Sequence, residues 1–193
     1  MQTLGLSDST PRTESRLRAL LWPSIRNETD FDYVTTQGFW ICFILACATV
    51  VLSVITSTPL SGLFVGVYFF LAGVGVRQRS RVAAICAFSS YLLSALVAQK
   101  YTGNGFGIVQ IIFLALLLSN VRGNWLSARW ASEQDSLGAP VRLNETFGDK
   151  LSDQLPTWLW PKARFIFYVL AAIEIGLLLV SLFALRPGVI PQG

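Results

Sequence analysis

Five apolar runs, separated by polar or charged residues, dominate the pattern along the chain. They cover residues 38–55, 60–76, 82–98, 105–121 and 165–185. At about 1.5 Å per residue, helices of 17 to 21 residues extend roughly 26 to 32 Å, close to the thickness of a bilayer's hydrocarbon core. The pattern therefore predicts an all-α fold, a polytopic membrane helix bundle of about five transmembrane helices.

Two further segments have an amphipathic pattern. Residues 16–25 place leucines near helical spacing beside arginines, which predicts a short helix at the membrane surface, interrupted by Pro23. The second segment repeats an apolar residue at every fourth position, at Leu143, Phe147, Leu151 and Leu155. We expect this second helix to pack on the membrane or under the bundle, with a partner protein as the alternative.

The distribution of basic residues predicts the orientation in the membrane. Lys and Arg number four before the first run, three between the second and third, and six between the fourth and fifth. Only Lys100 and Arg186 fall on the opposite side, so the bias is 13 against 2. Because cytoplasmic loops are enriched in Lys and Arg, we place the N-terminus in the cytoplasm and the C-terminus outside it.

Four segments follow from these patterns. Residues 1–37 form a cytoplasmic N-terminal segment with the interfacial helix and an acidic linker, and residues 38–121 form a four-helix transmembrane region. Residues 122–163 form a cytoplasmic amphipathic segment, whose first part, with Trp125 and Trp130, continues the fourth span helically. Residues 164–193 form the fifth transmembrane helix and a short external tail.

Composition narrows the possible functions. Hydrophobic residues make up 53% of the chain and charged residues 13%, a balance unsuited to a soluble surface. The basic residues lie in clusters beside apolar runs, so loop orientation explains them and nucleic acid is not an expected partner. The chain has no His, the commonest metal and haem ligand and the usual general base, so we expect neither a cofactor nor an enzyme. All three Cys lie inside apolar runs and are read as packing residues.

One carboxylate, Glu174, lies near the middle of the last apolar run. Since no Lys or Arg falls within any run, a charged Glu174 would have no opposite charge, and we expect a protonated, neutral side chain. Counting from the predicted helix ends places Thr49, Tyr68, Ser90 and Tyr91 at a similar depth. Glu174 is therefore the candidate residue, with these four as candidate hydrogen-bond partners. It either links helices or serves as the proton or cation exchange site of a small transporter.

Small residues recur at a spacing of four in several runs. Gly62 with Gly66, Ser90 with Ser94, and Ala172 with Gly176 show this spacing. It allows helix backbones to approach closely, either within this bundle or between copies of the chain.

Four short motifs carry a resemblance. They are Leu21-Trp-Pro-Ser-Ile-Arg26, Gln37-Gly-Phe-Trp40, Ser80-Arg-Val-Ala-Ala84 and Asn120-Val-Arg-Gly-Asn-Trp125. Over roughly residues 16–130 the chain resembles small bacterial multi-spanning inner-membrane proteins of unassigned function. The resemblance implies a bacterial inner membrane and supplies no activity and no site residues.

The expected function is that of a non-enzymatic membrane protein. We interpret the chain as a structural or accessory subunit of a membrane complex, whose partners are the lipid bilayer and other membrane subunits or further copies of itself. The alternative is a small proton-coupled exporter in which Glu174 carries the proton.

Overall fold

The computed structural model describes residues 22, 28–130, 154, 156 and 158–184. This part of the chain is helical apart from turns and short connections, and it contains no strand. Its helices are α2 (Glu28–Ile55), α3 (Pro59–Arg77), α4 (Arg81–Thr102), α5 (Ile108–Trp130) and α7 (Leu159–Ala184). Each includes a segment long and apolar enough to cross a membrane, so the predicted all-α membrane bundle is confirmed.

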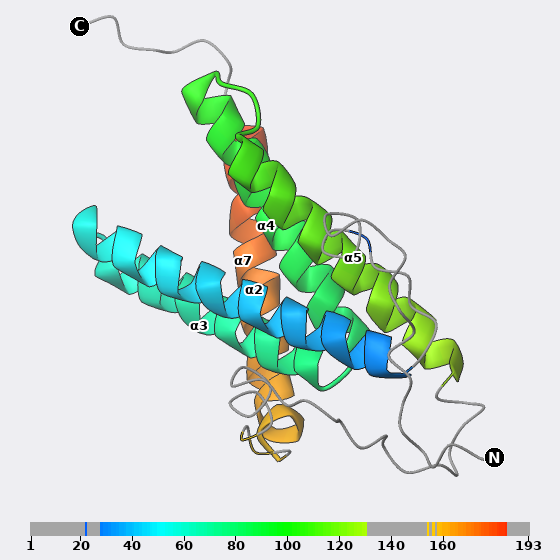
Figure 1. Cartoon of the computed structure of the whole chain (residues 1–193). Helices are drawn as coiled ribbons and strands as arrows, with labels where there is room; N and C mark the ends of the chain where they lie inside the picture. Colours follow the sequence, from blue (N-terminus) through cyan, green and yellow to red (C-terminus); the bar gives the residue numbers. More distant parts are fainter. Residues whose placement is uncertain (1–21, 23–27, 131–153, 155, 157, 185–193) are drawn as a thin grey trace, which may run out of the picture.

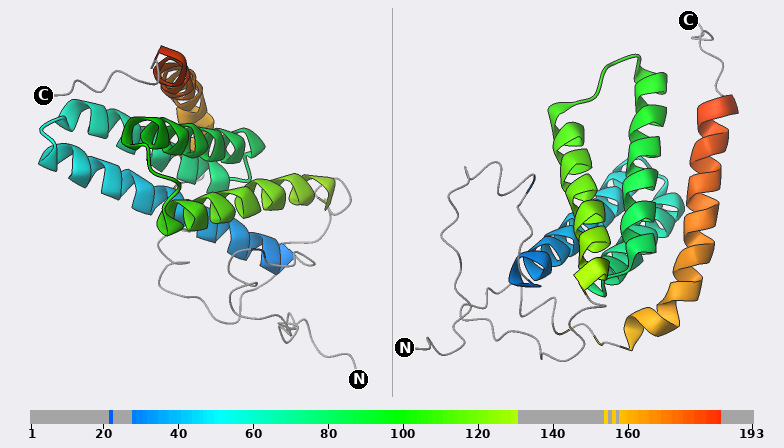
Figure 2. Two further views of the ribbon diagram at one scale, coloured as in Figure 1. Left: turned by 90° about the horizontal axis from the view of Figure 1, so that it is seen from above. Right: turned by 90° about the vertical axis from the view of Figure 1, so that its right-hand side faces the viewer.

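The helices are arranged as two hairpins and a single helix (Figure 1). One hairpin consists of α2 and α3, the other of α4 and α5, and α7 packs against α3 and α4. Figure 2 shows that α7 runs beside α4, while the α2–α3 hairpin leans away from the α4–α5 hairpin toward its own turn. The hairpins meet at the end of the bundle that carries Arg77, Arg79 and Arg81, called here the basic end.

Glycines allow α2 and α3 to pack closely. A Cβ added at Gly62 would lie 1.7 Å from the Ser53 Oγ, and one at Gly66 would lie 2.5 Å from the Val50 Cγ2. Neither position has room for a larger residue, so the predicted close approach of helices is confirmed for this pair. At the Ala172 and Gly176 pair no other described helix approaches closely, because a Cβ at Gly176 would meet nothing within 4 Å.

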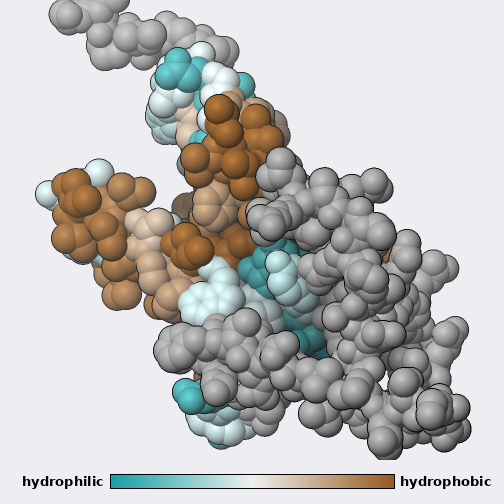
Figure 3. Space-filling model, in the orientation of Figure 1, coloured by the Kyte–Doolittle hydropathy of each residue, from teal (hydrophilic) through white to brown (hydrophobic). Residues whose placement is uncertain are grey.

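Apolar side chains fill the bundle and also cover much of its outside. The core forms around Cys42, Tyr68, Ala72, Leu117 and Phe167. Exposed apolar side chains cover the turn end of the α2–α3 hairpin, while hydrophilic residues gather toward the start of α2 (Figure 3). Such a surface suits contact with lipid rather than water, and the protein is an integral membrane protein.

Several helix ends differ from those predicted. The first span was expected to start at Gly38 after an acidic linker, but α2 begins at Glu28. Acidic residues favour the first turns of a helix because they face the positive end of its dipole, which explains why residues 28–32 are helical. Likewise α4 continues to Thr102, and α5 reaches Trp130 as predicted. Apart from Trp22, the predicted surface helix at 16–25 lies outside the described residues, and so does nearly all of the predicted amphipathic helix.

Candidate functional site

Glu174 lies on the single face that α7 turns toward α3 and α4. The buried residues of α7 are Ala163, Phe167, Ala171 and Glu174, which recur at helical spacing along one narrow line. The Glu174 side chain is only 7% exposed. In the described part of the chain it makes no hydrogen bond.

Two of the predicted partners form a direct pair beside this face. The hydroxyl groups of Tyr68 on α3 and Ser90 on α4 are 2.8 Å apart, and both residues are fully buried. The Tyr68 ring stacks on Phe167 of α7, with ring centroids 5.6 Å apart and an interplanar angle of 5°. Tyr68 and Ser90 therefore pair where α3 and α4 pack against α7, the helix whose buried face also carries Glu174. This arrangement places one carboxyl and two hydroxyls in an apolar interior, where they can hold or exchange a proton.

The other two predicted partners lie elsewhere. Tyr91 packs against Phe113 of α5, with ring centroids 5.9 Å apart. Thr49 donates a hydrogen bond of 2.7 Å to the Leu45 carbonyl oxygen within α2. Depth along the helices placed these residues level with Glu174, but the face of the helix decides which side chains meet, and Tyr91 is rotated about 100° from Ser90.

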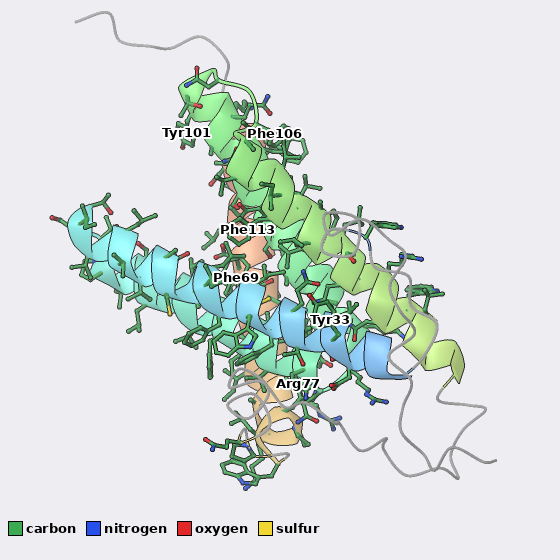
Figure 4. The ribbon with its side chains drawn as sticks, viewed as in Figure 1. Tyr33, Phe69, Arg77, Tyr101, Phe106 and Phe113 are labelled. Atoms are coloured by element: carbon green, nitrogen blue, oxygen red, sulfur yellow. The ribbon has the colours of Figure 1, made fainter. Side chains whose placement is uncertain are left out.

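A second polar cluster, at the basic end, was not predicted. The Arg77 guanidinium at the end of α3 donates from Nη1 to Asp32 Oδ1 of α2 at 2.6 Å and to the Thr35 Oγ1 at 3.3 Å. The Arg77 and Asp32 side chains are 12% and 23% exposed, so this ion pair is partly buried. Figure 4 places Arg77 at the opposite end of the bundle from Tyr101 and Phe106.

Two buried asparagines on α5 extend the polar cluster. Asn124 donates from its amide nitrogen to the Asn120 Oδ1 at 2.7 Å and to the Asn120 carbonyl oxygen at 3.1 Å. The Asn120 amide nitrogen lies against Gly38 of α2, where an added Cβ would be 1.2 Å away. Gly38 thus makes room for a polar side chain at the contact between α2 and α5. The spacing of two asparagines by four residues at the end of an apolar run was the sequence signal for this cluster.

Three buried polar atoms have no hydrogen-bond partner among the described residues. They are the Asn120 Nδ2, the Ser119 Oγ and the Thr36 Oγ1. A buried polar group that lacks a partner costs about 1 to 3 kcal/mol. Since Asn120 and Ser119 both lie on α5, we expect that helix to be held less tightly at the basic end than its burial alone suggests.

Metal binding receives no support from this part of the chain. Among the described residues, no group of three or more His, Cys, Asp or Glu side chains lies close enough to hold a metal ion. The thiols of Cys42, Cys47 and Cys86 are free, with Cys42 buried and Cys47 exposed.

A functional hypothesis for this protein rests on its side-chain geometry. Two polar regions of the bundle carry candidate chemistry: the Tyr68–Ser90 pair with Glu174 on the adjoining helix α7, and the cluster around Arg77 and Asn120. Comparisons of the chain with protein-family models, with curated proteins and with solved structures find no match.

Proposed function

We propose that the protein is a non-enzymatic structural or accessory subunit of a membrane complex. We place it in a bacterial inner membrane with its N-terminus in the cytoplasm, on the strength of the resemblance and of the distribution of Lys and Arg. The observation that carries the proposal is the packing of α7, whose buried residues all lie on one narrow face toward the other described helices.

From Phe165 onward, the remaining surface of α7 is apolar and exposed. Its exposed large hydrophobic side chains are Phe165, Ile166, Tyr168, Val169, Ile173, Leu177, Leu179, Val180 and Phe183. Among them lie Ala172, which is exposed, and Gly176, beside which a Cβ would meet nothing within 4 Å. Small residues let a second helix approach the backbone closely, so this face suits a partner's transmembrane helix.

Most polar side chains inside the bundle are used in contacts within it. Tyr68 and Ser90 bond to each other, and Ser94 donates to the Tyr91 carbonyl oxygen within α4. Hydrogen bonds of this kind link or stabilise helices in lipid. They favour a role in assembly over a polar path for a solute.

Affinity purification of the full chain in a mild detergent tests this proposal. A partner that co-purifies at a fixed stoichiometry should be lost when Gly176→Leu blocks the exposed face of α7. Ile111→Phe, at an exposed apolar position on α5, is the matched control and should retain the partner. A monodisperse protein without any partner, or equal loss in both variants, would rule the proposal out.

A small proton-coupled exporter remains the second candidate. It is favoured by one observation, the buried Glu174 carboxyl, which makes no hydrogen bond in the described part of the chain. In an exporter, Glu174→Gln abolishes a pH-dependent flux in proteoliposomes while the protein still folds. In a structural subunit, the same variant changes neither flux nor assembly, because a neutral amide replaces a neutral carboxyl.

A further inference from the structure

The short turn between α3 and α4 holds its three arginines in fixed positions. The Arg79 backbone has a φ of 61°, and the Ser80 amide donates to the Gly75 carbonyl oxygen at 2.9 Å. The Ser80 hydroxyl then caps α4 by accepting from the Ala83 amide at 3.3 Å. With the turn fixed in this way, Arg77 reaches Asp32, and Arg79 lies 5.0 Å from the centre of the Phe31 ring.

Arg81, the third arginine, lies over an exposed aromatic ring. Its guanidinium carbon is 5.7 Å from the centre of the Trp125 ring, and both side chains are exposed. Within the described residues, no carboxylate lies within salt-bridge distance of Arg81. The positive charge of Arg81 is therefore held in place by an indole but not neutralised by an acidic side chain of this region.

A second pair of the same kind stands at the start of α7. The Lys162 Nζ is 4.7 Å from the centre of the exposed Trp158 ring, and it too has no carboxylate partner in the described part of the chain. Trp160, between these two residues, packs against Gly75, where a Cβ would lie 2.3 Å from its ring. This contact brings the start of α7 to the turn between α3 and α4, so both cation and indole pairs belong to the basic end.

Exposed apolar side chains adjoin both cations. On α4 they are Val82 and Ile85, and on α7 they are Phe165 and Ile166. A ligand that contacts both a cation and the apolar helix face beside it must itself be amphiphilic, with an anionic head and a hydrocarbon tail. A nucleic acid or a soluble acidic protein carries negative charge without a hydrocarbon tail, whereas an anionic phospholipid has both.

We propose that the basic end binds anionic phospholipids, with Arg81 and Lys162 contacting the headgroup phosphates. The Trp125 and Trp158 rings lie at the level of the glycerol and headgroup region, where indole is favoured, and hold the two cations in position. The acyl chains lie along the exposed apolar faces of α4 and α7.

Lys100 provides the matched comparison because it is an exposed cation in the last turn of α4, remote from the basic end. Its Nζ donates at 2.5 Å to the Leu182 carbonyl oxygen near the end of α7, and no indole contact is present there among the described residues. Its charge compensates a helix terminus, so its removal should leave lipid binding unchanged.

Native mass spectrometry of the full chain in an uncharged detergent tests the proposal. We would titrate the protein with phosphatidylglycerol and, separately, with phosphatidylcholine, and count the bound lipids. The expected result is stronger binding of phosphatidylglycerol, weakened about fivefold in Arg81→Gln and about fivefold in Lys162→Gln. Arg81→Lys, which keeps the charge, and Lys100→Gln should both bind within about twofold of the unmodified protein.

Three results would overturn the proposal. Equal binding of the two lipids would show that the headgroup charge is not recognised. A fivefold loss in Lys100→Gln as well would attribute binding to net charge rather than to the basic end. Displacement of the lipid by inorganic phosphate alone would identify a free anion, not a phospholipid, as the ligand. Thermal unfolding of each variant checks the fold, and all four substitutions lie at exposed positions.

Discussion

Gly38→Ala probes the contact between α2 and α5 most directly. The added Cβ would lie 1.2 Å from the Asn120 Nδ2, 2.4 Å from the Asn120 Cγ and 2.9 Å from the Val76 Cγ1. The amide would have to rotate away, but Asn120 is only 2% exposed and its Oδ1 accepts a hydrogen bond from Asn124. We therefore expect the helices to separate or the hydrogen bond to break.

The expected change in the free energy of unfolding for Gly38→Ala follows from two costs and one gain. Overpacking a well-filled interior costs about 1 to 3 kcal/mol, and loss of the hydrogen bond between the asparagines adds about 1 kcal/mol. Replacing a helical Gly by Ala returns up to about 1 kcal/mol of helix propensity. The net expectation for Gly38→Ala is a decrease of about 1 to 3 kcal/mol in the free energy of unfolding.

Unfolding in mixed micelles of a mild detergent and sodium dodecyl sulfate measures this effect, with helicity followed by circular dichroism. In the double variant Gly38→Ala with Asn120→Ala, the new methyl occupies space that the amide has left. The double variant should therefore be more stable than Gly38→Ala alone, with a coupling energy of at least about 1 kcal/mol. Gly176→Ala, where a Cβ meets nothing within 4 Å, is the control and should cost nothing.

Additive effects of Gly38→Ala and Asn120→Ala would refute this reasoning, because residues that overlap in space must be coupled. An unchanged stability for Gly38→Ala would refute it as well, since the amide would then have room to move.

Three further predictions concern other contacts, all measured by the same unfolding assay. Tyr68→Phe should lower the free energy of unfolding by about 0.5 to 1.5 kcal/mol, and adding Ser90→Ala should cost little more, because one hydrogen bond of 2.8 Å is lost in either case. Gly66→Leu should destabilise the α2–α3 hairpin by more than Gly38→Ala does, since even a Cβ lies 2.5 Å from the Val50 Cγ2; equal stability would contradict the packing. Arg77→Gln should cost about 1.5 to 3 kcal/mol by removing a charge-assisted hydrogen bond from the partly buried Asp32 carboxylate, and Asp32→Asn should recover part of that loss.

The five helices were predictable because each apolar run is about as long as a bilayer is thick. Their ends were harder to predict. Asp32 looked like part of a linker in the sequence, yet it lies in α2, and Arg77, 45 positions along the chain, donates a hydrogen bond to its carboxylate. Local composition carries no information about such a distant partner.

For the candidate site, the sequence predicted how far along each helix the residues lie, but not which way their side chains face. Tyr68 and Ser90 lie level with each other and also face each other, whereas Tyr91 turns toward Phe113. Which faces meet depends on how the two hairpins cross, and that angle is set by close contacts such as the one between Gly38 and Asn120. A single sequence does not specify such a pairing between distant helices.

The narrow packing face of α7 has a consequence for how the protein is made. The Tyr68–Ser90 pair and the contacts of α2 with α3 and α5 involve only α2 to α5, so these four helices can assemble before α7 leaves the ribosome. The last helix then docks on a finished surface by stacking Phe167 on Tyr68. Two separately expressed chains, one ending after α5 and one beginning before α7, should therefore recombine in the membrane into a single complex.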